Sequence, residues 1–172
     1  METPISTIWD MLPEQISPPV LSDDLFWKQY EQNATDVVIH IAILSSSYLD
    51  LILNREKTVE SRFSVHRRMP YERIKEGDVI LFKQSGGLIK GVGYVDKVWF
   101  YELENGTLDH IKNKFGDDLQ IQDQAFWDRC QKASYATLIE LQHVRRIDPI
   151  NFSKRDRNAW VIFSPTSKPP HR

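Results

Sequence analysis

The sequence predicts an α+β fold: a small mixed β-barrel with a few interleaved helices. Several short segments rich in β-branched residues are separated by turn signals, as in an all-β or mixed barrel. The helical segments do not alternate regularly with the strands, which argues against a doubly wound parallel sheet. Gly91 and Gly93 lie inside the longest strand candidate, where they favour the bend or bulge that a closing sheet needs.

Residues 1–34 are expected to form an extension that docks on the barrel. Four prolines break up this segment, yet it carries too much apolar surface to remain in water. Its large apolar side chains include Trp9, Leu12, Leu25, Phe26, Trp27 and Tyr30. Within it, residues 23–32 predict a short helix with Ser22 as the N-cap.

Residues 35–164 are expected to form the barrel domain. Its predicted strands are 37–44, 58–63, 79–83, 88–101, 135–144 and 160–163. Its predicted helices are 46–54, 108–115 and 125–133. Ser46 or Ser47 is expected to be the N-cap of the first of these helices, and Asp50, three residues after Ser47, is placed for a capping box. The tail, residues 165–172, holds three prolines and is expected to be loose.

Composition restricts the class of protein. The chain has 172 residues and a formal net charge of −2, whereas a protein that coats DNA nonspecifically is usually basic. Cys130 is the single cysteine, so no internal disulfide can form and a reducing compartment is expected. The start of the chain is unlike a secretory signal, and no apolar run approaches the ~20 residues that span a bilayer. A cytoplasmic protein that does not enter the membrane is therefore expected.

The segment around residues 57–62 is the strongest candidate site. Lys57, Thr58, Glu60 and Arg62 place donors, acceptors and charges within six positions. The strand period of two puts the last three on one face, with apolar residues on the other. Such a strand can bury one face in the core and offer the other to a polar ligand. Ordinary ion pairs among Lys57, Glu60 and Arg62 are an equally open interpretation.

Two basic clusters follow this segment in the sequence. One contains Arg67, Arg68 and Arg73, and the other contains Arg145, Arg146, Lys154, Arg155 and Arg157. If the fold brings them to one rim, they form an electrostatic footprint for a polynucleotide; otherwise they form a solvated surface. Tyr48 and Tyr135 are the preferred candidates for stacking on a base.

Metal, cofactor and thiol chemistry find little support. The five histidines are scattered without ligand spacing, so no metal site is expected. The turn at 85–87 lacks the lysine and following helix of a phosphate-binding loop, and no cofactor is expected. Cys130 lies in an apolar helical stripe without a positioned base, which favours an inert core residue.

Three segments together resemble the ASCH family of the PUA-like superfamily. They are Tyr48 to Leu53, then Lys57 to Arg62, then Ile74 to Ile80 with Gly77-Asp78 at its centre. The family signature has a glycine or small residue two positions before a lysine, a glutamate and an arginine on the next strand, and a Gly-Asp turn. Here that first position is Arg55, and Asn54 is expected to take the left-handed turn instead. The resemblance extends over about residues 37–163.

The resemblance implies a PUA-like barrel with a cleft beside the Lys-Glu-Arg strand, and a ligand that is RNA or a modified nucleotide. It also implies an enzymatic activity as an alternative, because some members of the family are amidohydrolases acting on N4-acetylcytidine and at least one is a ribonuclease. The amidohydrolase pattern has a second threonine, as nucleophile, at the position of Glu60. A carboxylate does not replace a hydroxyl that must form an acyl-enzyme.

Three functions remain open at this point. The first is a domain that binds single-stranded RNA or a modified nucleoside. Its ligand-binding residues are expected to be Tyr48, Lys57, Thr58, Glu60, Arg62, Arg67, Arg68, Tyr135, Lys154, Arg155 and Arg157. The second is an enzyme of the same cleft, a metal-independent ribonuclease or an amidohydrolase, with Lys57, Glu60 and Ser134 as catalytic residues. The third is an adaptor that contacts a protein partner through its N-terminal extension.

Overall fold

The computed structural model describes residues 7–164 and confirms the predicted α+β fold. One mixed sheet forms the framework, with the strand order β2-β5-β4-β3-β1-β6. The strands are β1 (Ile39–Leu44), β2 (Val59–Ser64), β3 (Val79–Gln84), β4 (Ile89–Glu102), β5 (Tyr135–Ile150) and β6 (Trp160–Phe163). The helices are the 3-10 helix η1 (Ile8–Met11), then α1 (Leu25–Asn33), α2 (Ser46–Leu53), α3 (Thr107–Leu119) and α4 (Gln124–Cys130).

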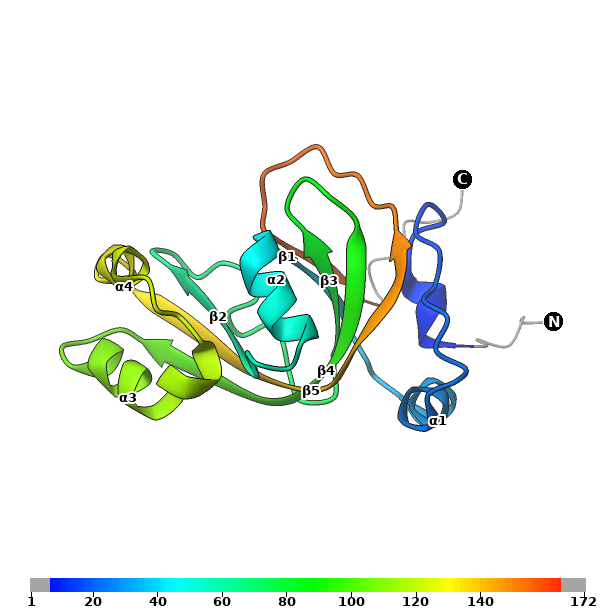
Figure 1. Cartoon of the computed structure of the whole chain (residues 1–172), viewed down its shortest axis with the longest axis horizontal. Coiled ribbons are helices and arrows are strands. Elements are labelled where there is room, and N and C mark those ends of the chain that lie inside the picture. The colour runs from blue at the N-terminus through cyan, green and yellow to red at the C-terminus, as the bar shows by residue number, and fades with distance from the viewer. Residues whose placement is uncertain (1–6, 165–172) are drawn as a thin grey trace.

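The sheet curls into a half-barrel with helices at both ends (Figure 1). The long antiparallel pair β4 and β5 runs the length of the molecule, from α3 and α4 at one end to α1 and η1 at the other. Helix α2 lies between these two ends. β1 and β3 are parallel, and the chain between them contains both α2 and β2 rather than a single crossover helix.

The glycines of β4 permit the curl, as the sequence predicts. The β3–β4 and β4–β5 registers shift at several points near Gly91 and Gly93, which are the expected bulges. A Cβ atom at Gly91 would lie 2.2 Å from the Leu53 side chain, and one at Gly93 would lie 2.8 Å from the Phe82 ring. Close packing across the concave side of the sheet therefore requires glycine at both positions.

Arg62 bridges the two edges of the sheet. β2 and β6 are the edge strands, and no strand pairing joins them within residues 7–164. The Arg62 guanidinium on β2 donates to the carbonyl of Ile43 at 3.0 Å and to that of Ala159 at 3.2 Å. It also lies 5.0 Å from the Trp160 ring. A side chain thus makes the connection that backbone bonds make in a closed barrel.

A buried polar network joins β1, β6 and the Gly-Asp turn. The Trp160 indole donates to His40 Nδ1 at 3.0 Å, and His40 Nε2 lies 2.9 Å from Asp78 Oδ2. Because an indole N–H only donates, Nδ1 must accept, and the His40 proton that Asp78 receives is on Nε2. Asp78 Oδ1 also accepts from the Val38 backbone at 3.1 Å and from Lys75 Nζ at 2.8 Å. The Gly-Asp turn of the signature therefore organises the fold.

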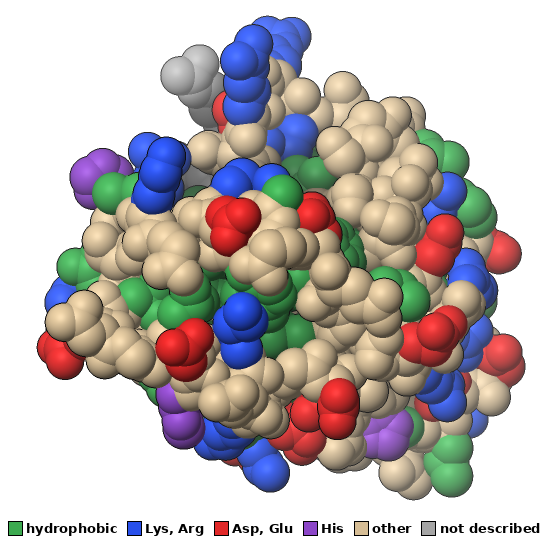
Figure 2. All heavy atoms as spheres, turned by 60° about the vertical axis from the view of Figure 1, so that its left-hand side comes forward, with side chains coloured by type: hydrophobic (Ala, Val, Ile, Leu, Met, Phe, Trp, Pro, Cys, Tyr) green, Lys and Arg blue, Asp and Glu red, His purple; other side chains and the backbone are tan. Residues whose placement is uncertain are grey.

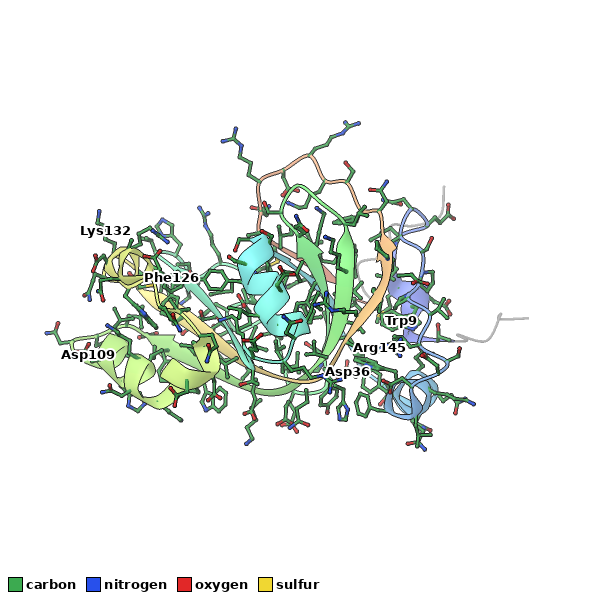
Figure 3. All side chains as sticks on the ribbon, in the orientation of Figure 1. Trp9, Asp36, Asp109, Phe126, Lys132 and Arg145 are labelled. Atoms are coloured by element: carbon green, nitrogen blue, oxygen red, sulfur yellow. The ribbon has the colours of Figure 1, made fainter. Side chains whose placement is uncertain are left out.

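The N-terminal segment packs against the barrel through its aromatic side chains. Trp27 is completely buried, and its indole donates to the carbonyl of His143 at 3.0 Å. Trp9 belongs to the same buried cluster as Ile39 of β1. Arg145 of β5 pairs with Asp23 at 2.9 Å, and Figure 3 shows Trp9 and Arg145 at the same end of the molecule. These tryptophans face the barrel rather than solvent.

Several predicted boundaries were wrong by a few residues. The N-cap of α1 is Asp24, whose carboxylate accepts from the Trp27 backbone, rather than Ser22. Helix α2 has Ser45 as its N-cap, without a side-chain bond, rather than Ser46 or Ser47. Strand β5 continues to Ile150, because β4 pairs with it as far as that residue.

The tight turn before Lys57 also differs from the prediction. Asn54 stays right-handed, and Arg55 itself takes the left-handed conformation with φ of 63°. The Arg55 side chain then donates to the carbonyl of Val144 at 3.2 Å, which holds the residue in place. The predicted tail, residues 165–172, lies outside the described residues. No helix in the described part of the chain has both the length and the apolar character needed to cross a membrane.

Candidate functional site

A groove of about 440 Å³ lies between β2, the start of α2 and the end of α4. We call it the Glu60 groove. Its lining is Ile43, Leu44, Ser45, Tyr48, Glu60, Ser61, Arg62, Phe63, Ser64, Val65, Phe126, Arg129, Cys130, Lys132 and Ala133. The strand period brings Glu60 and Arg62 to the same face of β2, as the sequence predicts. The groove is thus formed by segments that lie far apart in the chain.

Glu60 is buried, and its carboxylate is only half satisfied. The side chain is 5% exposed, and Oε1 accepts from Arg62 Nε at 3.1 Å. Oε2 has no hydrogen-bond partner, and Lys57 Nζ stands 4.0 Å from it, beyond hydrogen-bond range. Burying an unpaired carboxylate oxygen costs about 1–3 kcal/mol or more. Oε2 is therefore an unsatisfied acceptor that belongs to a residue of the groove lining.

Lys57 supports this carboxylate from behind the groove. It is 3% exposed, and its ammonium donates to the carbonyl of Leu119 at 2.6 Å. The ammonium also lies 5.4 Å from the Tyr48 ring. Burial lowers the pKa of Lys57, and the nearby charge of Glu60 opposes that shift. The lysine therefore acts on the groove electrostatically rather than by lining it.

Aromatic rings form the apolar wall of the groove. Phe126 of α4 makes edge contacts with Tyr48 and Phe63, with ring centroids 6.3 Å and 5.9 Å apart. Burial raises the pKa of the Tyr48 hydroxyl, so this side chain stays neutral. Cys130 closes the wall, and burial raises the pKa of its thiol to about 11, which is consistent with the predicted inert role. Flat apolar walls of this kind suit an aromatic ligand.

Several cations line the groove and a second hollow beside it, and acidic side chains also lie around this end of the molecule (Figure 2). Arg129 and Lys132 line the Glu60 groove. The second hollow, of about 890 Å³, shares Arg62 to Val65 with the groove and adds Arg68 and Arg157. Figure 2 shows this end of the molecule, with apolar side chains gathered in a hollow and Lys and Arg side chains above and within it. Lys132 and Phe126 lie at this end in Figure 3.

Other predicted ligand residues lie outside the groove. Thr58 donates to Asp118 at 3.0 Å and, with Lys57, lines a separate hollow of about 220 Å³. Arg67 pairs with Glu102 at 2.9 Å and lies over the Tyr135 ring at 5.3 Å. Thr58 and Arg67 therefore both make their polar contacts within the protein.

The predicted site residues from Ser134 onward also lie outside the Glu60 groove. Ser134 is exposed, and its backbone donates to the carbonyl of Ser64 at 2.9 Å, so it lies near the groove without lining it. Lys154 binds Asp156, and Arg155 is exposed outside the groove. Arg157 reaches the second hollow.

The sequence did not indicate Phe126, Arg129 and Lys132 as site residues. The spacing of Phe126, Cys130 and Ala133 indicated a helical stripe facing the core. Cys130 does belong to a buried cluster against which Phe126 packs, and the stripe also borders the groove. The two cations next to it had no motif of their own. No group of three or more His, Cys, Asp and Glu side chains within residues 7–164 is placed to hold a metal ion.

Comparison with known proteins identifies the fold. No family model and no curated protein matches the chain. Among solved structures, the ASCH protein of Zymomonas mobilis matches with 20% identity and a TM-score of 0.54, over 66% of this chain and 73% of that one. Two variants of the same protein, one with a tyrosine changed to phenylalanine and one with a serine changed to alanine, match with the same TM-score of 0.54. The chain therefore has the fold of an ASCH domain, which confirms the resemblance that its sequence predicts.

Proposed function

We propose that this protein binds an unstacked base of single-stranded RNA, or a modified nucleoside, in the Glu60 groove. The observation that carries the proposal is Glu60 Oε2, a buried carboxylate oxygen without a partner at the groove. A carboxylate accepts hydrogen bonds and donates none, so it favours a ligand edge that carries N–H groups. Among nucleobases, the amino group of cytosine is a suitable donor.

The rest of the groove fits the same ligand. Tyr48, Phe63 and Phe126 offer apolar ring surfaces against which a base packs. Arg129 and Lys132 at the rim are placed to contact phosphates. The net charge of −2 excludes a surface that is basic throughout. It does not exclude RNA binding through a local cluster of cations such as this one.

The hydrolase alternative has weaker geometric support. Lys57 already donates to the Leu119 carbonyl, Thr58 is bonded to Asp118, and Ser134 lies outside the groove lining. None of these side chains is arranged as a nucleophile beside a base. Recognition is the function that the groove supports best.

Binding to short labelled RNAs tests the proposal. We expect the wild type to bind single-stranded oligocytidine more tightly than oligouridine in fluorescence anisotropy, since uracil presents a carbonyl where cytosine presents the amino group. Glu60→Gln should reduce that preference, because an amide can both donate and accept. Glu56→Gln is the matched control, since Glu56 is exposed four residues away.

The same RNAs also test whether the protein cleaves RNA. Incubation without metal, followed by a denaturing gel, should leave the RNA intact with both wild type and Lys57→Ala. Cleavage by the wild type alone would make the protein a metal-independent ribonuclease with Lys57 in its site. Equal affinity for the two RNAs in wild type and in Glu60→Gln would exclude Glu60 as the base-reading group.

A further inference from the structure

A third hollow, of about 650 Å³, lies between the β3–β4 turn and the segment that precedes β6. We call it the Lys83 hollow. Its lining is Ile43, Leu44, Ser45, Lys83, Ser85, Gly86, Gly87, Asn151, Phe152, Ser153, Lys154, Asp156, Arg157, Asn158 and Ala159. Small and polar residues dominate it, unlike the aromatic Glu60 groove. This lining suits a polar, charged ligand group.

Lys83 is a buried cation without an acidic partner. It is 6% exposed at the end of β3, next to the bulge at which the β3–β4 register shifts. Its ammonium donates to the Gln84 carbonyl at 3.2 Å, and no ion pair involves Lys83 within residues 7–164. An ammonium has three donors, and a buried charge is normally paired. Lys83 therefore retains donor capacity toward the hollow that it lines.

The other charges of the hollow leave it positive. Asp156 is the only acidic residue in its lining, and it is bound to Lys154. Arg157 is exposed and makes no ion pair in the described part of the chain. Burial lowers the pKa of Lys83, and the charge of Lys154 lowers it further. An anion in the hollow would relieve both effects, because it would face Lys83 and Arg157 with no free carboxylate opposing it.

The Lys83 hollow adjoins the Glu60 groove. Both are lined by Ile43, Leu44 and Ser45, so the end of β1 is their common wall. The Lys83 hollow also shares Arg157, Asn158 and Ala159 with the second hollow, which contains Arg68. A strand with one base in the Glu60 groove can therefore pass over the end of β1 toward Lys83.

We propose that the Lys83 hollow is a phosphate subsite, which holds a backbone phosphodiester of the RNA strand whose base occupies the Glu60 groove. The inference rests on the proposed function and adds the path of the strand. Lys83 supplies a directed ammonium, and Arg157 supplies a second contact at the rim. Such contacts position the strand and carry no information about base identity.

The salt dependence of RNA binding tests this subsite. We expect Lys83→Met to weaken binding of labelled oligocytidine roughly tenfold, as for one charge-assisted hydrogen bond. The slope of log affinity against log salt should fall by about 0.7, the value for one phosphate contact on a single strand. The preference for oligocytidine over oligouridine should stay unchanged, unlike in Glu60→Gln.

Two further variants keep the test decisive. Lys90→Met is the matched control, because Lys90 lies on the neighbouring strand, contacts Gln84 at 2.6 Å and is outside the lining of the hollow. It should keep the wild-type slope. Arg157→Gln, at an exposed position, should lower the slope even if Lys83→Met fails to fold.

The possible failures are distinguishable. If wild type binds oligocytidine through Glu60 but Lys83→Met and Arg157→Gln keep its slope, the subsite is wrong and the proposed function stands. If inorganic phosphate protects wild type but not Lys83→Met against thermal unfolding while the RNA slopes are unchanged, the hollow binds a free anion instead. If wild type binds no RNA, both proposals are wrong.

Discussion

Two buried carboxylates occupy opposite situations in this molecule. Asp78 is 1% exposed, and its two oxygens accept from His40, from the Val38 backbone and from both the backbone and the ammonium of Lys75. Glu60 is 4% exposed, and one of its oxygens accepts from no group. The difference separates a carboxylate that builds the fold from one that keeps an unsatisfied oxygen and lines a groove.

The two environments have different physical consequences. A fully bonded carboxylate stabilises the native state, because every hydrogen bond it had in water is replaced. An unpaired carboxylate oxygen destabilises the native state until a ligand donates to it. Removing the charge should therefore have a large effect on stability at Asp78 and a small one at Glu60, and this contrast can be measured.

The largest effect is expected for Asp78→Ala. The substitution leaves the His40 Nε2–H, the Val38 N–H and the Lys75 backbone N–H without their acceptor. We expect the free energy of unfolding to fall by about 3–5 kcal/mol, because each buried donor left without an acceptor costs about 1–3 kcal/mol. Urea denaturation provides the measurement. Asp50→Ala, at an exposed position of α2, should change stability little, and equal effects of the two substitutions would contradict the role of Asp78.

The second largest effect is expected when the pH is lowered, because His40 is buried. Burial lowers the pKa of His40 below its usual value of 6.5, so the folded protein keeps this ring neutral while the unfolded chain takes up a proton below about pH 6.5. Stability should therefore fall as the pH drops from 7 to 5, by up to about 2 kcal/mol, since each pKa unit corresponds to about 1.4 kcal/mol.

The same measurement at lower pH reports on Asp78. Burial opposes ionisation of Asp78, but the hydrogen bonds from His40 and Lys75 prevail and lower the pKa of its carboxyl group. Its contribution is present above about pH 4 and is lost as the pH falls through the lowered pKa. His40→Gln should flatten the upper part of the profile, and His66→Gln, at an exposed position, should not. A wild-type profile that is flat between pH 7 and 5 would contradict the neutral buried His40.

The smallest effect on stability is expected for Glu60→Gln. Glutamine still accepts from Arg62, and the substitution removes a buried carboxylate oxygen that accepts no hydrogen bond. It also leaves the buried Lys57 ammonium, 4.0 Å away, without its nearest negative charge. We expect the free energy of unfolding to change less than in Asp78→Ala, because these two effects oppose each other, while the preference for cytosine is reduced. A loss of stability comparable to that of Asp78→Ala would place Glu60 among the residues that build the fold.

The order of the elements could be predicted because it depends on local patterns. β6 begins and ends where the sequence indicates, and β3 differs by one residue at its end. The end of β5 could not be predicted, since its extension depends on pairing with β4 across a large separation in the chain. For the same reason the left-handed residue fell on Arg55, whose side chain bonds to Val144 of β5, rather than on Asn54.

The sequence by itself determined the strands and the helices α1 to α4, though not η1, as well as the shared face of Glu60 and Arg62 and the Gly-Asp turn. Side-chain periodicity and turn chemistry act over a few residues, so they can be read from the chain. Only the tertiary structure decided that Arg62 bridges to Ala159, that Phe126 meets Tyr48, and that Glu60 keeps a free oxygen. These contacts depend on how the sheet curls, and the curl is a property of the whole sheet.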